Sequence, residues 1–131
     1  MKMEDIIDNL YERLPYYVTI GMEVKEVANG KSRIELMMRN ELSQNGMIHG
    51  GALASLIDAS CALAAFSATN FEGWVTTIDL QVSFLKPVSK GKLVAEGTCL
   101  RLGKNVSFCE SKIKNEEGEF VCIGTSQLLR I

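Results

Sequence analysis

The feature that most constrains this chain is a long apolar segment that begins near His49 and continues to Ala68. From Gly51 onward it is rich in alanine and leucine and contains no proline, which predicts a helix of about 17 residues. Apolar side chains occur nearly all round this helix, so we expect most of its surface to be buried. Because Asp58, serines and glycines interrupt the run, the segment is typical of a buried helix rather than a membrane span.

The residues around this helix predict strands. Asn29-Gly30 is the strongest short hairpin signal in the chain, and strands are expected near residues 18–28 and 31–39 on either side of it. A short amphipathic helix is expected over residues 3–13 and ends at Pro15. After the apolar helix the pattern predicts four further strands in a meander, over residues 74–85, 92–103, 105–115 and 120–131.

One long apolar helix and five or six antiparallel strands can bury one another only if the sheet curls around the helix. The expected fold class is therefore α+β, with an antiparallel sheet wrapped around one central helix. The chain has 131 residues, 47% of them hydrophobic, which suits one domain over residues 1–131 with a real core.

Composition excludes several classes of function. The net charge of -2 does not indicate the basic surface of a nucleic-acid-binding protein. Acids interrupt the N-terminal apolar residues, so no signal peptide is expected. One histidine and the absence of a C-x-x-C pair predict no metal site. We expect a cytoplasmic protein with reduced, buried thiols at Cys61, Cys99, Cys109 and Cys122.

Asp58 is the only side chain between His49 and Glu72 that carries a charge at neutral pH. A carboxylate in an apolar helix costs several kcal/mol unless it is compensated. Asp58 could be structural and accept hydrogen bonds from backbone or serine neighbours. We favour a functional role, because desolvated carboxylates tend to mark functional sites.

His49-Gly50-Gly51 lies where the apolar helix begins. Helix N-termini leave backbone N–H groups unpaired and favour negative charge, and glycines let a ligand atom approach them closely. Such a terminus can hold a carbonyl oxygen and stabilise the oxyanion formed when that carbonyl is attacked. The alternative is an ordinary helix start with His49 near the cap.

The spacing of Gly50 and Asp58 predicts a dimer. Eight residues of helix separate the two by about 12 Å, so they cannot both contact one carbonyl within a single chain. Two such helices, antiparallel across a twofold axis, would bring Gly50 of one chain to Asp58 of the other. If both residues act on one carbonyl, the protein is a homodimer with two equivalent sites.

The stretch GMIHGGALASLIDASCALA resembles the H-G-G…D signature of hotdog-fold thioesterases, specifically the phenylacetyl-CoA (PaaI-like) acyl-CoA thioesterase group. The likeness continues through TTIDLQVSFLKPV and LRLGKNVSFCESKIKNEEGEFVCIGT and covers roughly residues 20–129. It implies a hotdog fold and hydrolysis of acyl-CoA thioesters with no metal, no separate cofactor and no Ser-His triad. The group often forms tetramers from two dimers, so dimer and tetramer both stay open.

The resemblance also implies roles for individual residues. Asp58 matches the catalytic acid, which acts as nucleophile or as base on water, and Gly50 matches the residue whose backbone N–H polarises the thioester carbonyl. His49 matches the histidine that orients this loop or assists near the thiolate. Thr77 matches a hydroxyl residue that helps to hold water near the acid, although it could equally be a plain strand threonine.

One position departs from the group's pattern. Six residues before the histidine the group often has Asn or Gln, whereas this chain has Ser43. Gln44 or Asn45 could substitute, so the polar partner of His49 stays open. Asn45 and Gly51 are also counted among the expected substrate contacts.

Coenzyme A carries phosphates, so a cationic rim is needed. The resemblance places it at Lys86, before Pro87, and at Arg101 and Lys104, where RLGKN forms a turn whose N–H groups could meet a phosphate. Each of these charges could instead be a solvated surface residue. The sequence does not decide whether the acyl group is small, medium-sized or aromatic. The large side chains that could line its pocket could equally fill the core: Met22, Met37, Met38, Phe66, Trp74 and Phe84.

Two other functions compete with hydrolysis. A hotdog protein could bind acyl-CoA as a sensor without turnover. A hydratase or dehydratase on the same fold would need a His/Asp or His/Glu pair arranged for proton transfer at carbon, and the H-G-G start fits carbonyl polarisation better.

Overall fold

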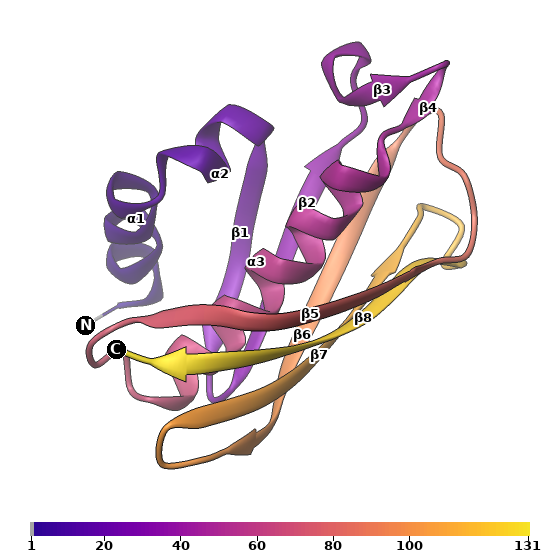
Figure 1. Ribbon diagram of the computed structural model, residues 1–131. Helices are drawn as coiled ribbons and strands as arrows, with labels where there is room; N and C mark the ends of the chain where they lie inside the picture. Colours follow the sequence, from indigo (N-terminus) through magenta and orange to yellow (C-terminus); the bar gives the residue numbers. More distant parts are fainter. Residues whose placement is uncertain (1) are drawn as a thin grey trace.

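A computed structural model describes residues 2–131 of the chain (Figure 1). Three α-helices, a 3-10 helix η1 and eight strands follow one another in the order α1 (Met3–Arg13), α2 (Pro15–Ile20), β1 (Met22–Ala28), β2 (Lys31–Met37), η1 (Asn40–Leu42), β3 (Ser43–Gln44), β4 (Met47–Ile48), α3 (Gly50–Ala68), β5 (Val75–Phe84), β6 (Lys92–Leu102), β7 (Val106–Lys114) and β8 (Phe120–Arg130).

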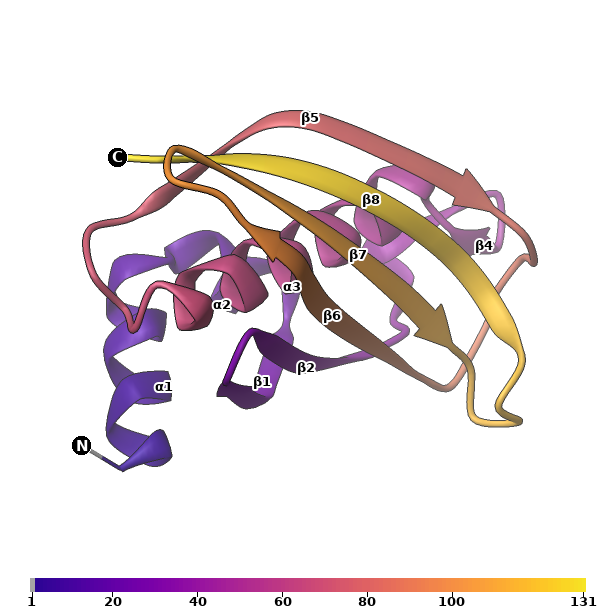
Figure 2. The ribbon, with the colours of Figure 1, turned by 90° about the horizontal axis from the view of Figure 1, so that it is seen from below.

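Six of the strands form one antiparallel sheet that curves around α3, as Figures 1 and 2 show from two directions. The strand order is β1-β2-β6-β7-β8-β5. This arrangement is the hotdog fold and confirms the predicted fold class. The predicted four-strand meander is wrong at its first step: β5 lies at the sheet edge beside β8, and the chain then crosses the helix so that β6 pairs with β2. As a result, β1 at one edge of the sheet and β5 at the other both contact α3.

Helix α3 is the core of the molecule. It is long and apolar enough to cross a membrane by length and composition alone, but 67% of that stretch is buried inside the protein. It packs tightly against the sheet at Gly97 of β6, where an added Cβ would collide with the carbonyl oxygen of Ser60. The prediction of a mostly buried helix is confirmed, and the helix has 19 residues rather than 17.

The N-terminal region contains one helix more than the sequence predicted. Helix α1 is where it was expected, but Pro15 is the first residue of α2 and does not merely end α1. Proline is favoured at this position because its missing N–H would be unpaired there in any case. The strand expected from about residue 18 therefore begins only at Met22, after Gly21 ends α2 with a left-handed φ of 92°.

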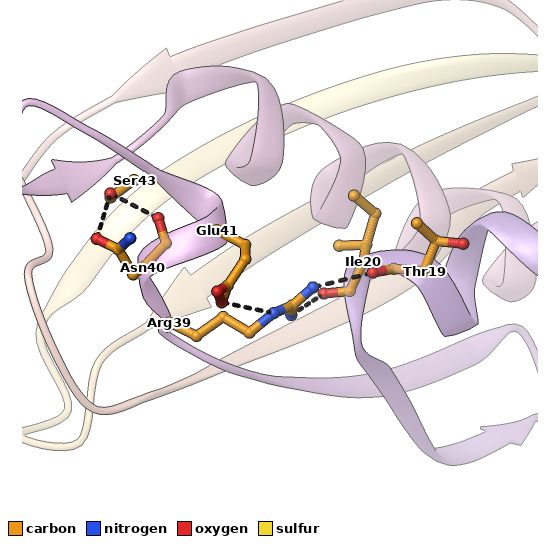
Figure 3. Close-up of polar contacts among 6 residues, drawn as sticks. All are labelled: Thr19, Ile20, Arg39, Asn40, Glu41 and Ser43. Atoms are coloured by element: carbon orange, nitrogen blue, oxygen red, sulfur yellow. Dashed lines mark hydrogen bonds and ion pairs between the residues drawn. The ribbon is translucent and has the colours of Figure 1, made fainter.

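Arg39 ties α2 to the segment that follows β2. Its guanidinium donates to the carbonyl oxygens of Thr19, at 2.9 Å, and of Ile20, and it lies 3.6 Å from the Glu41 carboxylate (Figure 3). The last carbonyls of α2 are thereby paired, which a helix end requires. Helix α2 is thus fixed to the loop that leads into β3 and β4.

Strand β5 contains a bulge. Thr77 lies opposite Leu128 and Asp79 lies opposite Gln127, so Ile78 has no partner of its own in β8. An extra residue on one strand bends it and reverses the alternation of its side chains. The regular alternation predicted over residues 74–85 therefore holds only as far as the bulge.

The buried residues of β8 show which side chains of β5 face α3, both before and after this bulge. Thr77 lies opposite Leu128 and Leu80 lies opposite Ser126, both fully buried in β8. Cross-strand partners share a face of the sheet. Thr77 before the bulge and Phe84 beyond it therefore both face α3.

Candidate functional site

The start of α3 presents one free backbone amide. His49 caps the helix, and its Nδ1 accepts a 2.7 Å hydrogen bond from the N–H of Gly51. Within residues 2–131, no group accepts a hydrogen bond from the N–H of Gly50. Gly50 thus keeps the donor that the sequence predicted, whereas the Gly51 amide is already engaged by the histidine ring.

A pocket of about 520 Å³ opens beside this free amide. It brings together five residues expected at the site, namely Asn45, Gly50, Phe84, Lys86 and Pro87. The rest of its wall consists of residues that the sequence did not single out as contacts: Gln44, Met47, Ile48, Leu53 and Leu85. The small β3–β4 hairpin and the end of β5 therefore form the two sides of the pocket.

The polar partner of His49 is not found among the three candidates named from the sequence. Ser43 donates its hydroxyl to the carbonyl oxygen of Asn40 at 2.7 Å (Figure 3). In the described chain, neither Gln44 nor Asn45 hydrogen-bonds the imidazole. His49 is fixed instead through its backbone N–H, which donates to the Leu42 carbonyl at 2.8 Å, and through its contact with Gly51.

Lys86 is paired with an acid in the free protein. Its Nζ lies 2.7 Å from Oε2 of Glu119, and both side chains are about half exposed. Exposed ion pairs of this kind contribute little to stability, so a phosphate could replace the carboxylate at small cost.

Arg101 and Lys104 lie away from the pocket. They belong to the end of β6 and the turn that follows, and neither lines the pocket at Gly50. Their neighbours Cys99 and Leu102 line a pocket with Ala68, the last residue of α3. In one chain these two cations therefore lie at the opposite end of the helix from Gly50.

Asp58 is held by the residue expected to assist it. Thr77 donates its hydroxyl to Oδ1 of Asp58 at 2.6 Å, which joins β5 to the middle of α3. Burial and the negative charge of Asp58 both raise the pKa of the nearby Tyr17 hydroxyl. Burial, aided by Asp58, raises the pKa of Cys61 to about 12, so that thiol is neutral at physiological pH.

The sequence did not indicate that Tyr16 and Tyr17 of α2 lie near Asp58. The hydroxyls of Tyr16 and Ser55 are 2.7 Å apart, and Ser55 precedes Asp58 by one helical turn. Tyr16 is exposed, whereas Tyr17 is buried. Both tyrosines belong to α2, which was not predicted because Pro15 can begin a helix as well as end one.

Within one chain, the two residues expected to act on one carbonyl are far apart. Gly50 and Asp58 are both on α3, eight residues apart, which is about 12 Å along the axis. No group of three or more His, Cys, Asp or Glu side chains in residues 2–131 is arranged to hold a metal ion. The chemistry available from these residues is a helix-terminal oxyanion site and a hydrogen-bonded carboxylate.

Comparison with known families and proteins gives a consistent result. The model of the thioesterase superfamily matches residues 45–122, which include His49, Asp58 and Thr77. A candidate esterase of Saccharolobus solfataricus is 31% identical over 114 residues, covering 85% of this chain and 81% of that protein. The medium/long-chain acyl-CoA thioesterase of Escherichia coli is 26% identical over 130 residues, covering 86% of this chain and 83% of that protein.

A solved structure shares the fold. The PaaI protein of the Escherichia coli phenylacetic acid degradation operon superposes with a TM-score of 0.87 at 21% identity, over 95% of this chain and 89% of that one. At this identity the likeness concerns the arrangement of helix and sheet.

Proposed function

Because the chain belongs to the thioesterase superfamily, we propose that it hydrolyses acyl-CoA thioesters with a small, medium-sized or aromatic acyl group. The observation that carries this proposal is the free Gly50 amide at the start of α3, in the wall of a 520 Å³ pocket that also contains Lys86. The similarity to a named acyl-CoA thioesterase supports coenzyme A as the leaving group.

The pocket residues suit the two ends of such a substrate. The thioester oxygen would accept a hydrogen bond from Gly50 N–H, where the positive end of α3 stabilises the negative charge that develops during attack. Lys86 would exchange Glu119 for a phosphate of coenzyme A. Phe84 lies against Gly50, since an added Cβ there would be 3.4 Å from its ring, and so shapes the space beside the reacting carbon.

Asp58 would supply the attack. Either its carboxylate attacks the carbonyl carbon, the C–S bond breaks and water then hydrolyses the resulting anhydride, or it removes a proton from the water that attacks. In both routes the sulfur leaves as the coenzyme A thiolate. Thr77 keeps the carboxylate oriented through its 2.6 Å hydrogen bond.

The proposal requires two chains. Gly50 and Asp58 of one α3 are too far apart to share a carbonyl, so each site would combine Gly50 of one protomer with Asp58 of its partner. Strand β5 supports this arrangement, because it pairs only with β8 and leaves its other edge open among the described strands. Open edges are surfaces where a second chain can add strands. Pairing two β5 edges about a twofold axis would run the two α3 helices antiparallel.

A complementation experiment tests the shared site. Asp58→Asn removes the attacking group. Gly50→Pro removes the one N–H in question, at the first helical position where proline is well tolerated, and its Cβ meets only ordinary contact with Phe84. Each variant alone should have lost most of its thiol-releasing activity on any acyl-CoA that the wild type hydrolyses.

Mixing the two variants after reversible dissociation should restore activity. Half of the dimers would be mixed, and each would hold one intact site, so about a quarter of wild-type activity should return. No recovery from mixed dimers that are shown to have formed would refute the shared site. Full activity in Asp58→Asn alone would refute the role of the carboxylate.

A further inference from the structure

Strands β6 and β7 place two cysteines directly opposite each other. Cys99 of β6 and Cys109 of β7 are register partners, and both are free thiols. The N–H of Cys99 donates to the Gly30 carbonyl at 2.7 Å and therefore points away from β7, along the edge of β6 that faces β2. Cys99 and Cys109 thus form a pair without backbone hydrogen bonds between them, for which the Cα atoms are about 4.5 Å apart. A disulfide requires about 4.4–6.8 Å, so the backbone can accept one here.

The two thiols differ in access to solvent. Cys109 is fully buried, whereas Cys99 is partly exposed and lines an open pocket of about 350 Å³ with Asn29, Ser67 and Asn70. This pocket is at the C-terminal end of α3, away from the pocket at Gly50. A small oxidant could therefore reach Cys99 and not Cys109.

An unpaired hydroxyl lies beside this pair. Ser107 Oγ is completely buried and is the one buried side-chain oxygen or nitrogen in residues 2–131 without a hydrogen-bond partner. Buried hydroxyls without a partner are rare and costly. Ser107 precedes Cys109 by two residues on β7, so its hydroxyl lies on the face of the sheet that carries both thiols.

The surroundings of Cys99 favour its thiolate. The contact with the Cys109 thiol and the backbone N–H of Arg101 lower the pKa of Cys99 to about 7, although burial opposes them. The same contact and burial raise the pKa of Cys109, which stays protonated. Thiolate character and access to solvent are the two properties that make a cysteine reactive toward peroxides.

We propose that Cys99 is a peroxide-reactive thiol and that Cys109 is its resolving partner. The Cys99 thiolate attacks one oxygen of the peroxide, the O–O bond breaks, and Cys99 becomes a sulfenic acid while the other oxygen leaves as hydroxide or alkoxide. The Cys109 sulfur then attacks the Cys99 sulfur, the S–O bond breaks, and the departing oxygen takes the Cys109 proton and leaves as water. The two thiols supply the two electrons that reduce the peroxide, and a β6–β7 disulfide remains.

Mass spectrometry of the folded, reduced protein tests this proposal with hydrogen peroxide as the probe. After oxidation the protein is denatured in N-ethylmaleimide, digested and mapped. The wild type should lose two alkylatable thiols and yield one linked pair, Cys99–Cys109. Cys122→Ser, a change in a buried cysteine on β8, is the matched control and should form the same link.

Two variants separate the roles of the pair. In Cys109→Ser the sulfenic acid cannot be resolved, so Cys99 should be labelled by dimedone. In Cys99→Ser, Cys109 should stay reduced, because it is buried and remains a neutral thiol. Four alkylatable thiols in the peroxide-treated wild type, a link between any other pair, or oxidation of Cys109 in Cys99→Ser would overturn the proposal.

Discussion

Thr77 and Asp58 are joined by a 2.6 Å hydrogen bond between the edge strand β5 and the central helix α3. The bond holds the Asp58 carboxylate in place through a residue of a different element, 19 positions further along the chain. The orientation of the proposed attacking group therefore depends on how β5 is seated against the helix.

Thr77→Val should lower the turnover of acyl-CoA by about tenfold or more, since a hydrogen bond to a charged group contributes about 1.5–3 kcal/mol. Turnover is followed by release of the coenzyme A thiol. Thr76→Val is the matched control. The side chain of Thr76, the preceding residue, is exposed and makes no hydrogen bond to Asp58. Equal turnover in the two variants would contradict a role for the Thr77 hydroxyl.

His49→Ala should reduce the free energy of unfolding by about 1 kcal/mol, because the side chain caps α3 by accepting from Gly51 N–H. Urea unfolding measures this change. His49→Asn supplies another capping side chain and should recover the stability, so any activity that it still lacks reports on the imidazole itself. A fully stable alanine variant would show that the cap contributes nothing.

Gly97→Ala should destabilise the fold by about 3 kcal/mol, because its Cβ would collide with the Ser60 backbone and force α3 off the sheet. Gly46→Ala is the comparison: it has open space around it but a φ of 79°, so only the left-handed conformation is penalised, by about 1 kcal/mol. Thermal and urea unfolding of both variants should rank them in this order. The reverse order would mean that α3 is not in close contact with β6.

The alkylation rate of Cys99 by iodoacetamide should rise with pH, reach half its maximum near pH 7 and level off above about pH 8. The lowered pKa means that the reactive thiolate forms at lower pH than in an ordinary cysteine, so the rate at pH 6 should be about a tenth of that at pH 8. In Cys109→Ala the largest lowering contact is lost, and the profile should move to higher pH. Peptide mapping gives the rate at this cysteine alone, and an unchanged profile in that variant would exclude the contact.

Local sequence patterns predicted the elements that depend on local chemistry. Asn29 and Gly30 both have positive φ, 53° and 75°, which the two-residue hairpin requires and which that dipeptide signals. Helix α3 was predicted from composition. Helix α2 was missed because Pro15 can end one helix or begin the next, and the sequence alone does not distinguish these.

Contacts between distant segments were harder to predict. The pairing of β5 with β8 is a choice among sheet orders that local patterns do not encode. The Asp58–Thr77 pair and the grouping of Gly50 with Lys86 came from family resemblance, and the structure places these residues near one another. The lack of a hydrogen-bond partner for the buried Ser107 hydroxyl could not be predicted, because it depends on which residues of other elements surround it.

The unmatched Ile78 in β5 has a consequence for the whole site. Thr77 and Phe84 are seven positions apart, an odd separation, and on a regular strand they would point to opposite faces of the sheet. The extra residue changes odd to even, so that one strand presents both the partner of the carboxylate and a wall of the pocket at Gly50 to the same helix. Deleting a single residue there would leave the strand in place and turn one of these two side chains toward the solvent.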